Sequence, residues 1–287
     1  PTGSFIADNN HFALAVIIVI PVLHFLQLQF TEAWKRHVMS VVMLLSIAAA
    51  LGSHSRGALL ALLAMVTVFW WRSSRKGVIG LMLIVSLVLI LPMMPEHWWE
   101  RMYSIADYQE DGSAMGRINA WLVAIDVAKT YFFGAGMSYN YSVFFQAFGV
   151  HETQVRAAHS IYFQILGNHG FVGLFLYLMV WFSTFRMAGR LRRVARTHSE
   201  AKWVGDLGAM VQVSLVGYAV GGAFLSMPYF DLPYNLVVAV VLANRWVDNR
   251  AWESEPNMSF LELVGLARKN KKNESTAPFS AREALPL

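Results

Sequence analysis

The chain has 287 residues, of which 56% are hydrophobic and 14% charged, and its mean hydropathy is +0.44. About 25% of the residues of a soluble domain are charged, so this composition excludes a soluble protein and predicts an integral membrane protein. The formal net charge of +5 fits basic loops beside a membrane, and we expect no nucleic-acid partner. Because the sequence lacks cysteine, disulfides and thiolate chemistry are excluded.

Apolar segments of helical length predict an all-α, polytopic membrane protein. Some of these segments are shorter than the about 20 residues that cross the hydrocarbon core without tilt. The seven predicted spans are Ala13–Phe30, Val38–Gly52, Gly57–Trp71, Val78–Met94, Ser160–Phe185, Val204–Met227 and Tyr234–Val247.

Lysine and arginine mark one side of the predicted spans. The connections after the first, third and fifth spans, together with the C-terminal tail, hold 18 of the 23 basic residues. Positive residues are retained in the cytoplasm, so we expect these connections inside. The remaining connections then face outward, into the periplasm of a double-membraned bacterium.

We expect a membrane domain over residues 1–250 and a basic, disordered cytoplasmic tail over residues 251–287. The membrane domain includes a large periplasmic loop, Pro95–Ala158, which is long enough to be functional rather than a linker. Within this loop, "SAMGRINAWLVAIDVAKT" has the apolar period of a helix. The following "FFGAGMSYN" is typical of a helix end and a turn, so the loop is predicted to be partly helical.

His159 stands where the outward loop meets the span that starts at Ser160. The positive end of a helix dipole disfavours a charged imidazole, so the position predicts a neutral ring that can accept a proton. Gly170 follows almost three helical turns later on the same predicted face, and Gly167, Gly170 and Gly173 would let another helix approach closely. The alternative is an interfacial histidine that only caps the helix or reaches to the membrane surface.

Three of the four arginines on the predicted outer side are candidates for the site. Arg56 begins the third span, and Arg117 and Arg156 lie in the outward loop. A guanidinium at a membrane boundary is unfavourable unless it is paired or functional. Several guanidiniums beside helix N-termini suit a phosphate-rich ligand. The alternatives are a lipid-phosphate contact for Arg56 and simple solvation for the other two.

The remaining polar residues are expected to be structural. The acidic stretch "DYQEDG" is typical of a solvated turn, with a metal site at Asp107, Glu110 and Asp111 as the alternative. Asp8 or Asn9 is expected to cap the first helix, with a substrate role for Asp8 as the alternative. His169 is expected to pack or to form a hydrogen bond. No nucleotide-binding or zinc motif is present, so we expect no cofactor and no metal.

Three stretches carry a resemblance to a known family. They are "RGALL" (Arg56–Leu60), "HSIYFQILGNHGFVG" (His159–Gly173), and the segment Gly116–Asn140, where an arginine precedes a tryptophan and a Phe-Gly-x-Gly turn. The first is similar to an arginine, three residues, leucine motif. The second is similar to a pattern of histidine, Asn/Ser/Gln, nine residues, Gly, two residues and Gly. Both motifs are typical of the bacterial O-antigen ligase and O-antigen polymerase superfamily.

The resemblance covers most of the chain from Phe5 to about Trp246. Members of the superfamily usually have more membrane helices, so the chain looks like the C-terminal part of such a protein. The overall sequence also resembles the branch of O-glycosylation ligases associated with exosortase systems.

The resemblance implies a GT-C-like glycosyltransferase of the bacterial inner membrane, with its site facing the periplasm. Such a ligase moves a glycan from undecaprenyl pyrophosphate to an acceptor hydroxyl, with inversion. The resemblance leaves the acceptor open: lipid A core, as in lipopolysaccharide assembly, a protein, or another sugar chain. The resemblance also implies that His159 is the catalytic base and that Arg56 and Arg117 hold the pyrophosphate. Arg156, from its position, is a further candidate. The expected partners are the lipid-linked donor, the hydroxyl acceptor and membrane lipids.

Two rival functions remain open at this point. One is a polymerase of the same superfamily, which would join repeat units into chains. The other is a transporter for a lipid-linked glycan, with a purely structural subunit as a third option. A transporter is expected to keep its polar groups near the bilayer midplane, whereas the candidate residues here gather at one outer face.

Overall fold

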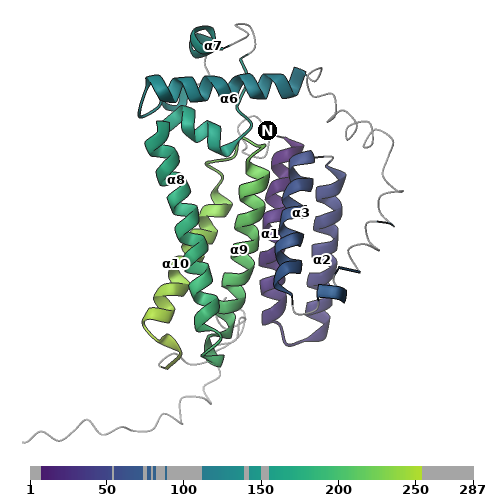
Figure 1. The fold of residues 1–287 in the computed structure, drawn as a ribbon. Helices are drawn as coiled ribbons and strands as arrows, with labels where there is room; N and C mark the ends of the chain where they lie inside the picture. The colour runs from purple at the N-terminus through teal and green to yellow at the C-terminus, as the bar shows by residue number, and fades with distance from the viewer. Residues whose placement is uncertain are drawn as a thin grey trace, which may run out of the picture.

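The computed structural model consists of α-helices and short helical turns, and the residues it describes include no strand (Figure 1). It describes residues 8–53, 55–73, 76–78, 80–81, 88, 112–138, 142–149 and 155–253. The predicted all-α class is therefore confirmed. The helices are α1 (Asn9–Gln29), α2 (Ala33–Gly52), α3 (Arg56–Arg72), α6 (Gly112–Thr130), α7 (Ser142–Phe148), α8 (Ile161–Val194), α9 (Lys202–Gly222) and α10 (Asp231–Asp248).

Two of the helices begin at residues whose side chains cap them. The Asp8 carboxylate accepts the backbone N–H of Asn10 at 3.1 Å, and the Ser55 hydroxyl accepts that of Ala58 at 3.2 Å. Each bond satisfies a backbone donor that the first turn of a helix leaves without a partner. Of the two caps predicted for the first helix, Asp8 and Asn9, the structure has Asp8. Ser55 fixes Arg56 as the first residue of α3.

Among the described residues, α1, α2, α8 and α9 (with the turn before it) are long and apolar enough to cross a membrane. Helix α3 is shorter, at 17 residues, and α10 carries Asp231, Arg245 and Asp248 within its 18. Each predicted span falls on one of these helices except Val78–Met94, most of which lies outside the described residues.

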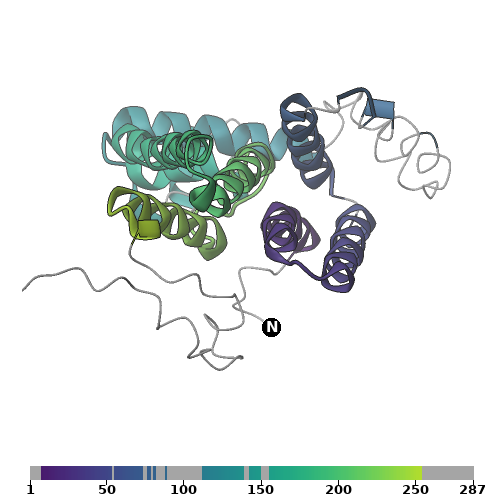
Figure 2. The same cartoon turned by 90° about the horizontal axis from the view of Figure 1, so that it is seen from below.

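Helix α9 is the centre of the bundle. In its most apolar 18-residue stretch, 72% of the residues are buried, whereas in that of α2 only 6% are buried. Seen along the bundle, α9 lies between α8 on one side and α1 and α3 on the other (Figure 2). Its glycines allow this close packing: a methyl group on Gly208 would lie 2.4 Å from the Ala188 carbonyl oxygen, and one on Gly217 would lie 2.2 Å from Met65 Sδ. Small residues at a helix interface let backbones approach closely.

The two ends of the bundle differ in charge. Helices α1, α3 and α8 begin, and α2 and α9 end, at the end where the N-terminal part of the chain lies, which we call the site end (Figure 1). The opposite end, which we call the basic end, carries most of the described lysines and arginines. The alternation deduced from the basic residues therefore matches the order in which the helices cross the bundle.

Helix α6 lies across the site end, nearly at right angles to the bundle (Figure 1). The helix predicted from the apolar period of the outward loop is thus confirmed. Its buried residues pack with Phe145 of α7 and with Ala158: they are Ala120, Val123, Ala124 and Val127.

Helix α8 is not the continuous span that the sequence suggests. It begins at Ile161, and Gly170 interrupts it with φ 65° and ψ −165°. The part before Gly170 runs beneath α6, and the part after it descends through the bundle (Figure 1). The prediction that His159 and Gly170 share one helical face is therefore wrong, because His159 precedes the helix and the backbone turns at Gly170.

Candidate functional site

Three helix N-termini meet on one pair of glycines at the end of α9. A methyl group on Gly221 would lie 2.5 Å from Leu14 Cδ1 of α1, and one on Gly222 would lie 2.6 Å from Ile161 Cδ1 of α8. A methyl group on Gly57 of α3 would lie 3.8 Å from the Gly221 carbonyl oxygen. Because helix N-termini carry partial positive charge, their convergence favours an anion at this end of the bundle.

His159 is held between α6 and the segment that follows α9. Its backbone N–H donates to the Ser226 hydroxyl at 3.0 Å. On the other side, the indole N–H of Trp121 donates to the Ala158 carbonyl at 2.6 Å, and the Trp121 ring stacks on Phe163 at 4.8 Å. His159 has φ 45°, a left-handed conformation that is uncommon outside glycine and that recurs at functional sites.

The environment of His159 favours its neutral form. Burial is the largest cause that lowers the pKa of His159 below its ordinary value of 6.5, and the charge of Arg117 lowers it further. Asp8 opposes these effects, while His11 and Arg156 add to them. The neutral ring was predicted from the helix dipole, and the direction agrees, but burial and Arg117 are the main causes. A neutral imidazole at ordinary pH can accept a proton.

The structure brings most of the predicted site residues together. Arg117 of α6 and Arg156 both act electrostatically on His159. Arg156 lies against α6, because a methyl group on Gly116 would come within 2.6 Å of its Cδ. Arg56 begins α3 at the same end of the bundle, beside the Gly57 contact with α9. The three arginines thus come from different segments and share the site end with His159.

Two residues at the start of α1 join this group: Asp8, which was expected mainly as a cap, and His11, which was not predicted to belong to the site. Asp8 and His11 both act on His159, and both ring nitrogens of His11 are buried without a hydrogen-bond partner among the described residues. Burial raises the pKa of the Asp8 carboxyl, but hydrogen bonds from Asn10 and the nearby imidazoles outweigh burial and lower it overall. Asp8 therefore caps α1 and also places a negative charge near His159. The stretch "ADNNHFA" contained both residues, but only packing on α9 brings them to the site.

Gly167 and Gly170 of α8 pack against a turn and not against another helix. The backbone N–H of Ala135 donates to the Gly167 carbonyl at 3.0 Å, and a methyl group on Gly170 would lie 2.0 Å from the Phe132 carbonyl oxygen. The prediction that these glycines admit a neighbouring helix is wrong: the Phe-Gly-x-Gly turn after α6 fills this position. We call this contact, formed by residues 132–135 and 167–170, the backbone clasp.

A small polar cluster lies at the clasp. The Asn168 amide donates to the Tyr229 hydroxyl at 2.8 Å, and His169 Nε2 lies 2.9 Å from the same hydroxyl. Since the Tyr229 oxygen accepts from Asn168, its own proton is free to go to His169 Nε2. The prediction that His169 forms a hydrogen bond within the bundle is confirmed, and this bond joins α8 to the segment after α9.

An apolar groove of about 330 Å³ opens between α8 and α9. Ile161 and Tyr162, two and three residues after His159, form part of its wall. Its lining is formed by Ile161, Tyr162, Leu178, Trp181, Phe182, Leu215, Tyr218 and Ala219. The groove can therefore hold a hydrocarbon chain whose polar end lies near His159.

The described residues contain no group of three or more side chains suited to hold a metal ion. The acidic residues Asp107, Glu110 and Asp111 lie outside the described part of the chain. Both the solvated turn and the expected absence of a metal therefore stay predictions.

Residues 41–178 match a family model described as O-antigen ligase. The matched segment contains Arg56, Arg117, Arg156 and His159, and it ends within α8. No curated protein matches the chain.

Proposed function

The chain belongs to the O-antigen ligase superfamily of membrane enzymes, and from this premise we propose that it is a ligase for a lipid-linked glycan. In this proposal the glycan leaves undecaprenyl pyrophosphate and joins an acceptor hydroxyl on lipid A core or on a protein. One observation carries the proposal: α1, α3 and α8 begin together at the end of α9, with His159 and three arginines around their N-termini.

His159 acts as the general base. Its imidazole takes the proton of the acceptor hydroxyl while the oxygen bonds to the anomeric carbon and the bond to the pyrophosphate breaks. Attack from the face opposite the leaving group inverts the anomeric centre. A positioned base contributes about 10²–10⁴ in rate. The lowered pKa of His159 supports this role, because the base must be neutral before the reaction.

Arg56, Arg117 and Arg156 hold the pyrophosphate. Guanidinium groups form paired hydrogen bonds with phosphate oxygens, and fixed positive groups stabilise the charge that grows on the leaving group. Support comes from their different origins: Arg56 is fixed by the capped start of α3 and Arg117 by α6. Charges on separate, packed elements stay in place when the donor departs.

The groove between α8 and α9 receives the first isoprenoid units of the donor. Its lining is apolar and includes Ile161 and Tyr162, two and three residues after His159. A donor lying in this groove would present its pyrophosphate at the site end. The same arrangement favours an enzyme over a transporter, because the polar groups gather at one end of the bundle instead of its middle.

The site end faces the periplasm in this proposal, and the protein resides in the bacterial inner membrane. Support comes from the distribution of lysine and arginine, since the basic end carries most of them and such residues stay in the cytoplasm.

Reconstitution tests the function directly. The purified protein in vesicles is given a lipid-pyrophosphate glycan and, separately, lipid A core or a serine-containing protein acceptor. We expect one glycan transferred per acceptor site, and no transfer by His159→Ala that has inserted and purified normally. A ladder of glycan lengths without an added acceptor would identify a polymerase instead. Normal turnover by His159→Ala would remove the general base from the proposal.

A further inference from the structure

Two arginines lie near each other at the basic end, and neither forms an ion pair with a carboxylate among the described residues. Arg72 is the last residue of α3, and Arg192 lies in the last turn of α8. Their positive charges are close enough to repel each other. The described part of the chain forms no ion pair with either of them. Arg196, one turn further along, adds a third positive charge near Arg192.

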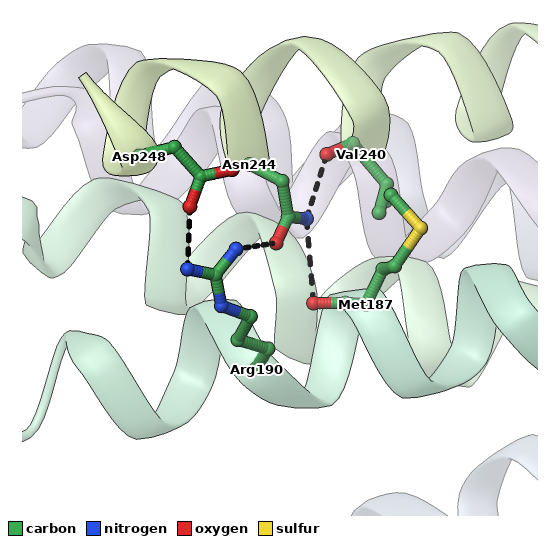
Figure 3. Close-up of polar contacts among 5 residues, drawn as sticks. All are labelled: Met187, Arg190, Val240, Asn244 and Asp248. Atoms are coloured by element: carbon green, nitrogen blue, oxygen red, sulfur yellow. Dashed lines mark hydrogen bonds and ion pairs between the residues drawn. The ribbon is translucent and has the colours of Figure 1, made fainter.

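Arg190, a neighbouring arginine, differs from Arg192 because it has a carboxylate partner. Arg190 of α8 forms an ion pair with Asp248 of α10 and donates to the Asn244 amide oxygen at 3.3 Å (Figure 3). Asn244 in turn donates to the Val240 carbonyl of its own helix and to the Met187 carbonyl of α8. A carboxylate and an amide thus neutralise and fix Arg190, two residues before Arg192.

Arg192 is held in place by an uncharged amide, and Arg72 has a buried Nη1 without a partner among the described residues. Arg192 Nη1 donates to the Gln212 side-chain oxygen of α9 at 3.0 Å, and the Gln212 amide donates to the Phe185 carbonyl at 2.8 Å. Arg72 Nη1 is buried and has no hydrogen-bond partner among the described residues. A buried donor without a partner is unfavourable, more so when it is charged. Two positive charges on helices that both pack against α9 favour the binding of an anion near them.

We propose that Arg72 and Arg192 form a second anion site, which binds a phosphate group at the end of the bundle opposite His159. The guanidinium fork fits two phosphate oxygens. Both arginines stand at the ends of helices of the membrane bundle, where phospholipid headgroups lie. Anionic lipids attract basic residues on the cytoplasmic side. The phosphate of an anionic phospholipid and free inorganic phosphate offer the same chemistry, and the experiment separates these two sources.

The test compares lipid retention between variants. The full chain is purified in detergent and incubated with equal amounts of phosphatidylglycerol and phosphatidylcholine, and bound lipid is counted by native mass spectrometry. We expect the wild type to retain phosphatidylglycerol in preference. Arg72→Gln and Arg192→Gln should each lower its affinity about tenfold or more, the effect of losing a charge-assisted hydrogen bond. The control is Arg193→Gln, which removes an equal but exposed charge from the next position and should keep the preference.

A parallel measurement follows the melting temperature in rising inorganic phosphate. A phosphate-dependent rise in the wild type that is absent in Arg72→Gln, without any lipid preference, supports the site and assigns it to the free ion. If Arg72→Gln does not fold, Arg72→Lys keeps the charge and loses the fork, and should bind lipid less tightly. Equal losses in Arg193→Gln and Arg192→Gln, or no response to either lipid or phosphate, would overturn the proposal.

Discussion

His159 lies between charges of opposite sign, and this balance sets its protonation. Arg117 and burial favour the neutral ring, whereas Asp8 favours the charged one. His11 and Arg156 act in the same direction as Arg117. Since the base works only when deprotonated, the rate of transfer should rise with pH through the pKa of His159, which lies below 6.5.

Removing the charge of Asp8 or of Arg117 should shift the pH at which the rate of transfer rises, in opposite directions. Asp8→Asn removes the opposing negative charge, so the pKa of His159 falls and the acidic limb of the pH–rate profile moves to lower pH. Asparagine still caps a helix, so α1 should keep its start. Arg117→Gln removes a positive charge, so the limb should move to higher pH while the maximal rate falls. The measurement is the profile of kcat over about two pH units either side of the ordinary imidazole pKa of about 6.5. Shifts in the same direction for both variants would contradict this account of His159.

Arg56 separates binding from chemistry. Arg56→Lys keeps a positive charge at the start of α3 but loses the fork, so donor binding should survive in part while turnover drops by about tenfold or more. Arg56→Ala should lose both. Lys129→Gln serves as the control, since Lys129 is an exposed residue of α6 that pairs with Asp126 at 2.8 Å. Affinity for purified lipid-linked donor and turnover are measured together. Equal activity of Arg56→Lys and wild type would show that Arg56 only contacts lipid phosphate.

Part of the site could be predicted from the sequence and part could not. His159, Arg56 and Arg117 stand beside helix starts and family motifs that can be read locally. Asp8 and His11 lie more than 140 residues before His159, and nothing local links them to it. Asp8 and His11 come close to His159 only because Leu14 and Ile161 pack on adjacent glycines of α9. This packing is tertiary structure, which a local sequence pattern does not reveal.

At the scale of elements, the backbone clasp determines how α6 sits over the bundle. The turn after α6 bonds to α8 through Ala135 and Gly167, and Gly170 adopts a conformation open essentially to glycine alone. The clasp therefore fixes Arg117, which α6 carries, relative to His159, which precedes α8.

Two glycine substitutions isolate the effect of the clasp. Gly170→Ala places a methyl group 2.0 Å from the Phe132 carbonyl oxygen, whereas Gly136→Ala meets nothing within 4 Å at a similar φ of 70°. Both should lose about 1–3 kcal/mol of stability through backbone strain. Only Gly170→Ala should also release the turn, seen as faster proteolysis of the segment after α6 and a loss of kcat. Identical behaviour of the two variants would mean that the clasp does not position α6.

The helices themselves were predictable because apolar length and caps are local properties. The interruption at Gly170 was not, since the sequence pattern is equally compatible with a continuous helix. What breaks it is the approach of residues 132–135 from another part of the chain. The backbone clasp therefore depends on two segments, residues 132–135 and 167–170, which approach each other closely because both contain glycines.

For the whole molecule, the two ends of the bundle predict an orientation. The chain has no native cysteine, so single cysteines can report which side each end faces. Thr130→Cys, at the exposed end of α6, should react with a membrane-impermeant maleimide added to intact spheroplasts. Thr197→Cys, exposed beyond α8, should react only after lysis. The reverse pattern would put His159 in the cytoplasm and remove the basis of the proposed reaction.

Helix α9 has a consequence for how variants of this protein are interpreted. It contributes no side chain to the proposed chemistry, yet α1, α3 and α8 all rest on its glycines. A methyl group on Gly217, one turn below Gly221, would push against Met65 of α3, at 2.2 Å from its Sδ. In a saturation mutagenesis screen, such a substitution would resemble the loss of an active-site residue while leaving every reacting group intact. Sensitivity to substitution at the glycines of α9 is therefore a measure of alignment between helices, and the groups that react are to be sought at the helix starts it supports.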